Sequence, residues 1–218
     1  MQTGWRCNND GIDIVSSQDI VVENCFIRSA DDAIAVKGLD AAMDTVNVTV
    51  RDSILFPHGN CMEVGFELFN NFVKDITFER NQCWHQMMSA MSVHDGGHAV
   101  VADLTYRDII VEGLFAEPKQ VAHDVSYGYK LLDLQIIQSH YSGPDMNRRG
   151  AVRNVLYSNI SYVSNGLQWV RSRVVGNSTA HAVVGVRFED FTINGTKVSS
   201  LADLGTVDNS FLRNVSFG

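Results

Sequence analysis

Two acidic segments near the amino terminus repeat one another at an interval of 22 residues. Residues 8–14 (NNDGIDI) superpose on residues 30–36 (ADDAIAV), so that Asp10 falls on Asp32. If each segment begins one rung of a parallel stack, the spacing between strands places Asp10 and Asp32 about 5 Å apart, with Asp31 beside them. Three ionised carboxylates at that separation repel one another, and folds keep such strain mainly where chemistry uses it. Asp10, Asp31 and Asp32 are therefore the candidate catalytic residues.

A phrase of alternating apolar residues that ends at Asn or Asp recurs along the rest of the chain. Its turn residue stands at positions 24, 52, 81, 108, 159 and 190, in steps of 28, 29, 27, 51 and 31 residues. β-rich units repeated at such intervals are typical of solenoids, in which each unit buries its apolar face against its neighbours. The pattern predicts one all-β domain over residues 1–218, a right-handed, single-stranded parallel β-helix of about seven or eight coils. The step of 51 is expected to contain one extra coil, carried by residues 131–137.

Charge and hydropathy exclude several classes of partner. The formal net charge of −8 and the absence of clustered Lys and Arg argue against a nucleic-acid surface. Nothing in the sequence is long and apolar enough to predict a membrane-spanning helix. The chain enters the strand pattern within about ten residues of Met1, without a capping helix. Because a solenoid end needs a cover, we expect the chain to lack its amino-terminal coils and cap.

The four cysteines, Cys7, Cys25, Cys61 and Cys83, show neither a CxxC spacing nor paired His residues, so no metal site is predicted. Cys25 and Cys83 stand beside turn residues, where small apolar side chains stack inside coils. We expect buried free thiols rather than disulfides. No cofactor is expected.

The paired segments carry a family resemblance. Asn-Asn-Asp-Gly followed by Asp-Asp-Ala-Ile-Ala-Val resembles the Asn-Thr-Asp-Gly and Asp-Asp-Cys-Ile-Ala-Ile motifs of the family 28 glycoside hydrolases, the polygalacturonase and rhamnogalacturonase group, which has the pectin-lyase-like β-helix fold. The resemblance implies a secreted or periplasmic, cell-wall-degrading hydrolase that inverts the anomeric centre of a polysaccharide or oligosaccharide. By position, Asp31 is then the general acid, and Asp10 and Asp32 activate water. Adjacent residues on a regular strand point to opposite faces, so Asp31 and Asp32 share a cleft only if the coil bends where the strand starts.

Departures from the family motifs bear on the substrate. Asn60 replaces the histidine of a Gly-His-Gly motif, and Ser92 and His94 replace an Arg-x-Lys pair that would grip a uronate. Without these cations the charge-assisted contacts that select an acidic sugar are lost, so a neutral glycan is the expected substrate. Lys37 points outward by parity, toward Asp31, Asp32 or a bound sugar. The candidate substrate-binding residues are Lys37, Asn60, Glu63, Glu67, Ser92, His94, Asp95 and Tyr129.

Two other classes of function remain open at this stage. A polysaccharide lyase or epimerase on the same scaffold would need a Lys or Arg base and often calcium, and its lyase product absorbs in the ultraviolet. A glycan-binding or structural β-helix would bind saturably without releasing product. Among hydrolases, the family 49 dextranase type is the nearest alternative, with a weaker motif match.

Overall fold

A computed structural model describes residues 8–84, 88–113, 130–137, 148–164 and 171–218. All regular elements in these ranges are β-strands, arranged in two long sheets. Neighbouring strands pair in parallel, except for a short antiparallel pair formed by β15 (Val183–Ile193) and β16 (Thr196–Lys197). The predicted all-β parallel β-helix is confirmed. No helix among the described residues has the length and apolarity needed to cross a membrane.

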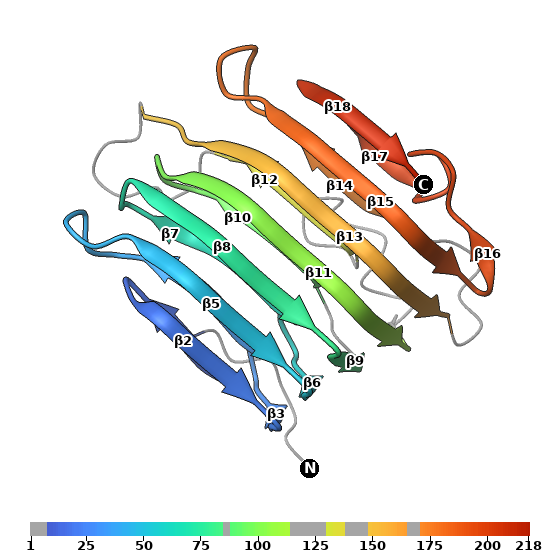
Figure 1. Cartoon of the computed structure of the whole chain (residues 1–218), viewed down its shortest axis with the longest axis horizontal. Helices are drawn as coiled ribbons and strands as arrows, with labels where there is room; N and C mark the ends of the chain where they lie inside the picture. The colour runs from blue at the N-terminus through green and yellow to red at the C-terminus, as the bar shows by residue number, and fades with distance from the viewer. Residues whose placement is uncertain (1–7, 85–87, 114–129, 138–147, 165–170) are drawn as a thin grey trace.

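Each coil adds one strand to the seven-stranded sheet and at least one strand to the other sheet. The seven-stranded sheet contains, in spatial order, β1 (Ile12–Val15), β4 (Ile34–Gly38), β7 (Met62–Leu68), β10 (Ser89–Asp95), β12 (Lys130–Ile136), β14 (Ser172–Val175) and β17 (Thr206–Asp208). Strands of the 11-stranded sheet run side by side in Figure 1; they are β2 (Gln18–Glu23), β3 (Phe26–Arg28), β5 (Thr45–Arg51), β6 (Ile54–Phe56), β8 (Phe72–Glu79), β9 (Gln82–Trp84), β11 (Val100–Glu112), β13 (Ala151–Val163), β15 (Val183–Ile193), β16 (Thr196–Lys197) and β18 (Leu212–Phe217).

The register confirms the 22-residue repeat and corrects the role predicted for residues 131–137. Ile12 pairs with Ile34, as the superposed segments predict. The extra coil expected within the step of 51 is wrong, because β11 pairs directly with β13, with Arg107 opposite Ser158. Strand β12 belongs to the same coil as β13 and pairs with β10 and β14 in the other sheet. The additional residues therefore lie in the connections on either side of β12.

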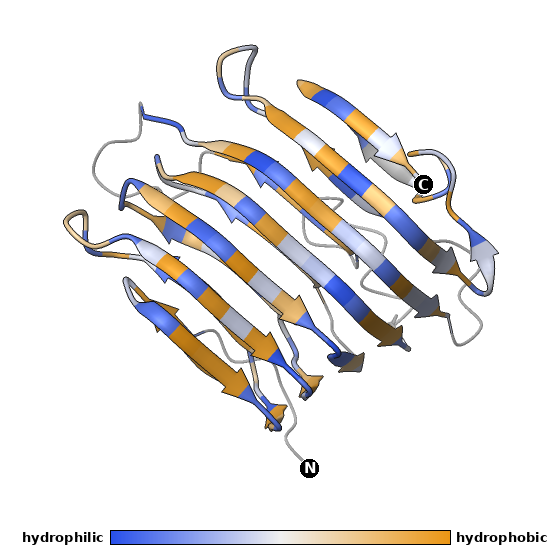
Figure 2. Ribbon diagram, viewed as in Figure 1, coloured by the Kyte–Doolittle hydropathy of each residue, from blue (hydrophilic) through white to orange (hydrophobic). Residues whose placement is uncertain are grey.

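The interior is filled by the inward side of each strand, which gives the alternating hydropathy seen along the ribbons in Figure 2. A column of aromatic rings runs through five consecutive coils. Its stacked neighbours, with centroids about 5 Å apart, are Phe78, Tyr106, Tyr157, Phe188 and Phe217. The coils are thus joined by side-chain stacking as well as by backbone hydrogen bonds.

Two rows of residues in the left-handed backbone conformation bend the coils at fixed places. The predicted turn residues Asn24, Asp52, Asp108, Asn159 and Asp190 form one row, with φ between 50° and 56°. At the third coil the left-handed residue is Arg80 rather than the predicted Asn81; Asn81 is buried and accepts the Ser53 amide. The second row, missed by the sequence, lies five residues earlier in each coil and contains Asp19, Asn47, Asp75, Asp103, Asn154 and Gly185. Asn, Asp and Gly are the residues that adopt this conformation at least cost.

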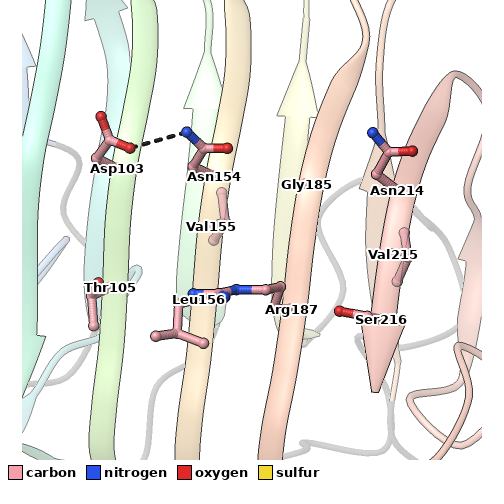
Figure 3. A pocket seen from close by; sticks show the side chains of 10 residues that line it. All are labelled: Asp103, Thr105, Asn154, Val155, Leu156, Gly185, Arg187, Asn214, Val215 and Ser216. Atoms are coloured by element: carbon pink, nitrogen blue, oxygen red, sulfur yellow. Dashed lines mark hydrogen bonds between the residues drawn. The ribbon is translucent and has the colours of Figure 1, made fainter. Parts of the chain in front are cut away.

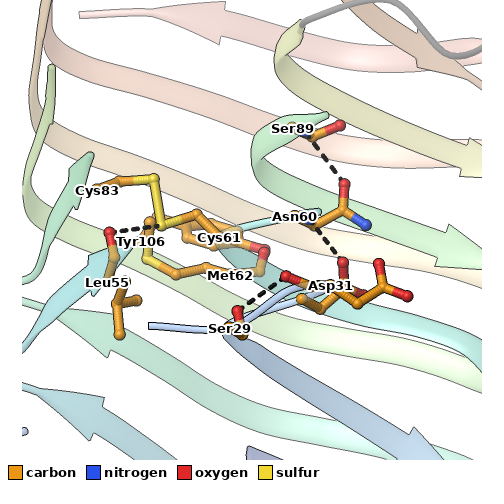
Figure 4. The surroundings of a disulfide bond; sticks show 10 residues. Ser29, Asp31, Leu55, Asn60, Cys61, Met62, Cys83, Ser89 and Tyr106 are labelled. Atoms are coloured by element: carbon orange, nitrogen blue, oxygen red, sulfur yellow. Dashed lines mark hydrogen bonds between the residues drawn. A yellow bond between two sulfur atoms is a disulfide. The ribbon is translucent and has the colours of Figure 1, made fainter. Parts of the chain in front are cut away.

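The prediction of free thiols is wrong for Cys61 and Cys83, which form a disulfide with a Cα–Cα separation of 6.2 Å (Figure 4). Cys61 directly precedes β7 and Cys83 lies in β9, so the bond closes the third coil across the core. The separation of 22 residues along the chain does not reveal this bond, because the bond forms only when the third coil folds back on itself. Cys25 is free and half-buried, and Cys7 lies outside the described residues.

Candidate active site

The three candidate catalytic aspartates lie together at the start of the first two strands of the seven-stranded sheet. Asp10 precedes β1, and Asp31 and Asp32 precede β4. The Gly11 amide donates to the Asp32 carbonyl at 2.8 Å, and the amides of Ala30 and Asp31 donate to the Asn9 carbonyl at 3.2 Å. These bonds hold the two segments edge to edge, as the repeat predicts.

Gly59 on the third coil allows the doublet to share one place. A Cβ added at Gly59 would lie 2.5 Å from Asp32 Oδ1 and 2.7 Å from Asp31 Oδ1, so both carboxyls converge on this residue. The doublet precedes the regular part of β4, so strand alternation does not separate its side chains. The bend that a shared cleft requires is present.

Lys37 neutralises the amino-terminal side of the cluster. Its Nζ lies 3.0 Å from both Asp10 Oδ2 and Asp13 Oδ2, and 3.9 Å from Glu67 Oε2. Its expected pairing with Asp31 or Asp32 is not the one observed, because Lys37 pairs in register with Val15 and reaches the carboxylates of the first coil. Burial disfavours the ammonium, but the bonds to Asp10 and Asp13 more than offset that and keep the pKa of Lys37 above its ordinary value. Asp10 and Asp13 are thereby ion-paired with the same ammonium.

Asp32 has the opposite environment. Its side chain is almost wholly buried, and its Oδ1 accepts the Asn60 amide at 2.6 Å. Burial, followed by the nearby charge of Glu63, raises the pKa of Asp32 well above its usual range, against the smaller effect of the Asn60 bond. Asp31 is more exposed, and its Oδ2 accepts the Asn8 amide at 2.8 Å. The two sides of the cluster thus differ: Asp10 lies against the Lys37 ammonium, whereas burial favours the neutral form of Asp32.

Three of the predicted substrate-binding residues, Glu63, Ser92 and His94, form a buried network beside the cluster. His94 Nδ1 lies 2.8 Å from Glu63 Oε1, and the Ser92 hydroxyl donates to Glu63 Oε2. The Phe66 ring stacks on the His94 imidazole at 4.4 Å. At most 2% of each of the three residues is exposed, so they contact one another rather than open solvent.

The sequence did not identify the other end of this network. His94 Nε2 lies 3.2 Å from Asp133 Oδ2, and Asp133 also pairs with Arg173 at 2.8 Å and Lys130 at 3.2 Å. Burial opposes the charge on His94, but Glu63 and Asp133 more than offset it and raise the pKa of His94 to about 10. Asp133 pairs in register with Ser92. An alignment of residues 131–137 with β10, instead of their assignment to an extra coil, would have placed Asp133 in this network.

The remaining candidate substrate-binding residues differ in where they lie and in how deeply they are buried. Asn60 is buried; its side-chain oxygen accepts the Ser89 amide at 3.1 Å (Figure 4), so it connects the doublet to the next coil. Asp95 is fully buried at the end of β10. Glu67 is partly exposed beside Lys37. Tyr129 lies outside the described residues.

Two hollows mark the surface of the described part of the protein. One of about 330 Å³ adjoins the cluster and is lined by Asn8, Asp10, Asp13 and Lys37. A larger one of about 690 Å³ lies on the outer face of the 11-stranded sheet, where Gly185 interrupts the row that contains Asp103 and Asn154 (Figure 3). Asp103 is the one carboxylate in its lining, so it lacks the two carboxyls that glycoside hydrolysis uses. No group of three or more His, Cys, Asp or Glu side chains suited to a metal ion occurs among the described residues.

Comparisons with known proteins agree with the fold and the paired motifs. The family model of the glycosyl hydrolases family 28 matches residues 2–127, which include the aspartate cluster. The structure of a Yersinia enterocolitica family 28 exopolygalacturonase superposes with a TM-score of 0.51 at 14% sequence identity, over 94% of this chain and 38% of that one. The chain thus spans well under half the length of that enzyme. No curated protein matches. The extent of the family match shows that this chain belongs to the glycosyl hydrolases family 28.

Proposed function

We propose that the protein hydrolyses glycosidic bonds with inversion, using the carboxyls of Asp10, Asp31 and Asp32. The observation that carries the proposal is a contrast within one cluster: Asp10 is ion-paired with Lys37, whereas burial raises the pKa of Asp32. Inverting hydrolysis needs one carboxylate to activate water and one carboxylic acid to protonate the leaving oxygen. Family membership supports the same reaction class.

Within this mechanism Asp31 protonates the leaving glycosidic oxygen, and Asp10 and Asp32 act on the attacking water. Asp31 suits the acid role because it is the more exposed member of the doublet and so the one a sugar can reach. A proton on either carboxyl belongs to the coupled doublet, since the two carboxyls converge on Gly59. Substrate binding would then draw that proton to Asp31.

The proposed substrate is a neutral polysaccharide or oligosaccharide. Ser92 and His94 stand where a uronate-binding pair would be, and His94 is already held between Glu63 and Asp133. Lys37 is likewise engaged by Asp10 and Asp13. With these cations neutralised, hydroxyl groups suit the site better than a sugar carboxylate.

The first prediction separates the roles of the doublet. Asp31→Asn is expected to lower kcat on a glycan at least about 10²-fold, the usual range for losing a general acid, while activity is largely retained on an aryl glycoside whose leaving group needs no proton. Asp32→Asn is expected to lower both activities, because water positioning serves either substrate. Asp190→Asn, an exposed change on the other sheet, is the control.

The measurement is a screen of neutral and acidic polysaccharides, with NMR of the first-formed anomer of the product. A retained anomer contradicts the mechanism, and a clear preference for polygalacturonate contradicts the neutral substrate. Retention of aryl glycoside activity by Asp32→Asn, with its loss in Asp31→Asn, would exchange the two roles. Unaltered turnover in both variants would remove the proposal altogether.

A further inference from the structure

Glu63 lies at the end of the buried network on β7, the strand that pairs with β4 beside the acidic cluster. Glu63 pairs in register with Ala35, which lies three residues after Asp32. Asn60, three residues before Glu63, donates its backbone amide to the Asp32 carboxyl. Its side chain is completely buried. Its two oxygens are held separately, one by the Ser92 hydroxyl and the other by His94 Nδ1. Glu63 is therefore fixed in position and has no route to solvent that would screen its charge.

The far end of the network explains how a glutamate can be buried at position 63. His94 is charged because it lies between two carboxylates, and Asp133 is anchored by the fork of Arg173 with bonds of 2.8 and 3.0 Å. Burial disfavours the Asp133 carboxylate, but His94, Arg173 and Lys130 more than offset that and hold its pKa below the usual range. Opposite charges thus alternate from Arg173 through Asp133 and His94 to Glu63, each with a paired neighbour.

We propose that Glu63 is a positioning residue for catalysis: clamped by Ser92 and His94, its carboxylate presents a fixed negative charge to Asp32 and so retains a proton on the Asp31–Asp32 doublet. This inference rests on the hydrolase function proposed above. Nothing in it requires Glu63 to touch the substrate.

The other charged groups around Asp32 do not replace this effect. Asp31 and Asp10 also disfavour its ionisation, but less than Glu63 does, and Asp10 is paired with Lys37. The Asn60 amide acts in the opposite sense, because a hydrogen bond to the carboxylate favours the charged form. Burial and Glu63 are thus the two main causes that keep the proton in place.

The test is Glu63→Gln, which keeps the shape of the side chain. The side-chain amide that this substitution introduces is able to donate to the Ser92 hydroxyl while its oxygen accepts from His94, so the clamp survives and the charge is lost. Because the doublet must carry a proton, activity falls as the pH rises through its pKa. Removing a neighbouring negative charge lowers that pKa, so the alkaline limb of the kcat/KM profile is expected to move about 1 pH unit lower, with KM little changed.

The matched control is Glu79→Gln. Glu79 is also nearly buried, lies on the same coil in β8, and bonds to Arg80 and Arg107 away from the cluster. A merely structural role for Glu63 predicts that both variants lose stability and keep their pH profiles. The proposal predicts that the alkaline limb moves in Glu63→Gln alone.

Carboxyl ¹³C NMR titration of Asp32, assigned with Asp32→Asn, gives a readout that needs no turnover. An Asp32 pKa that is ordinary in the wild type, or unchanged by Glu63→Gln, overturns the inference while leaving hydrolysis intact. A wild-type protein inactive on every glycan overturns the proposed function while the titration still decides the role of Glu63. If Glu63→Gln does not fold, the double change Glu63→Gln with His94→Gln removes the ion pair as a unit and should shift the titration in the same direction.

Discussion

At the scale of single residues, burial separates the acids of this protein into distinct classes. Asp10 is ion-paired with Lys37, whereas burial raises the pKa of Asp32. Asp133 is buried as deeply as any of them and yet is ionised, because three cations surround it. The sequence shows all three only as aspartates; their partners decide their chemistry.

Asp95 offers a test of this principle in stability. Burial raises the pKa of Asp95 to about 8, from its ordinary value of 3.8, against smaller effects of the Gly97 amide and Arg149. Between these two values the folded protein binds a proton that the unfolded chain has released. The contribution of Asp95 to stability is therefore fully present below about pH 4 and is lost as the pH rises toward 8, with a slope of up to about 1.4 kcal/mol per pH unit.

Asp95→Asn keeps the shape and cannot ionise, so we expect it to become more stable relative to the wild type as the pH rises from about 4 to about 8. Urea unfolding across that range measures the difference. A difference that stays constant with pH would show that Asp95 is ionised in the folded state.

At the scale of elements, the two rows of left-handed residues set where each strand bends. Within each row, side chains also bond along the stack: Asn159 Nδ2 donates to Asp108 Oδ1 at 2.7 Å, and Asn47 Nδ2 donates to Asp19 Oδ1 at 2.6 Å. A residue in these rows is thus selected both for its backbone conformation and for a contact with the next coil.

Asn159 separates the two contributions. Asn159→Ala loses the side-chain bond and places an alanine at φ 51°, so we expect it to cost about 1–2 kcal/mol of unfolding free energy. Asn159→Gly loses the same bond without the conformational cost, so it should retain more stability than the alanine variant. Equal losses in denaturant titrations would contradict a role for the backbone conformation.

At the scale of the whole molecule, the column of stacked rings joins five successive coils in addition to their strand pairing. Tyr157 lies at its centre, 5.1 Å from Tyr106 and 5.2 Å from Phe188, and is fully buried. Its hydroxyl has no hydrogen-bond partner among the described residues. Tyr157 therefore contributes through its ring rather than its hydroxyl.

Tyr157→Ala is expected to cost about 3–5 kcal/mol, and Tyr157→Phe to be neutral or stabilising because it removes a buried, unsatisfied hydroxyl. Each coil of a solenoid contacts only its neighbours, so hydrogen-exchange protection in the alanine variant should fall first in β11, β13 and β15, and last in β2. A uniform loss of protection would show that the molecule unfolds as a single unit.

The 22-residue repeat and the recurring turn residues were sufficient to predict the parallel coils and the grouping of Asp10, Asp31 and Asp32. Both predictions depend on periodicity, which the order of residues along the chain records directly. The position of residues 131–137 was predicted wrongly because the long connections around β12 break the period. Left-handed turns were placed correctly at Asn24, Asp52, Asp108, Asn159 and Asp190, where Asn or Asp marks them.

By itself, therefore, the sequence determined the coiled architecture and the place where three acids meet. Only the tertiary structure decided that Lys37 pairs with Asp10, that Cys61 bonds to Cys83, and that Glu63 and His94 are buried with Asp133 instead of lining an open cleft. These outcomes depend on the depth of burial and on contacts between different coils. A periodic pattern specifies which residues share a row, but it does not specify what covers them or which neighbouring side chain each one contacts.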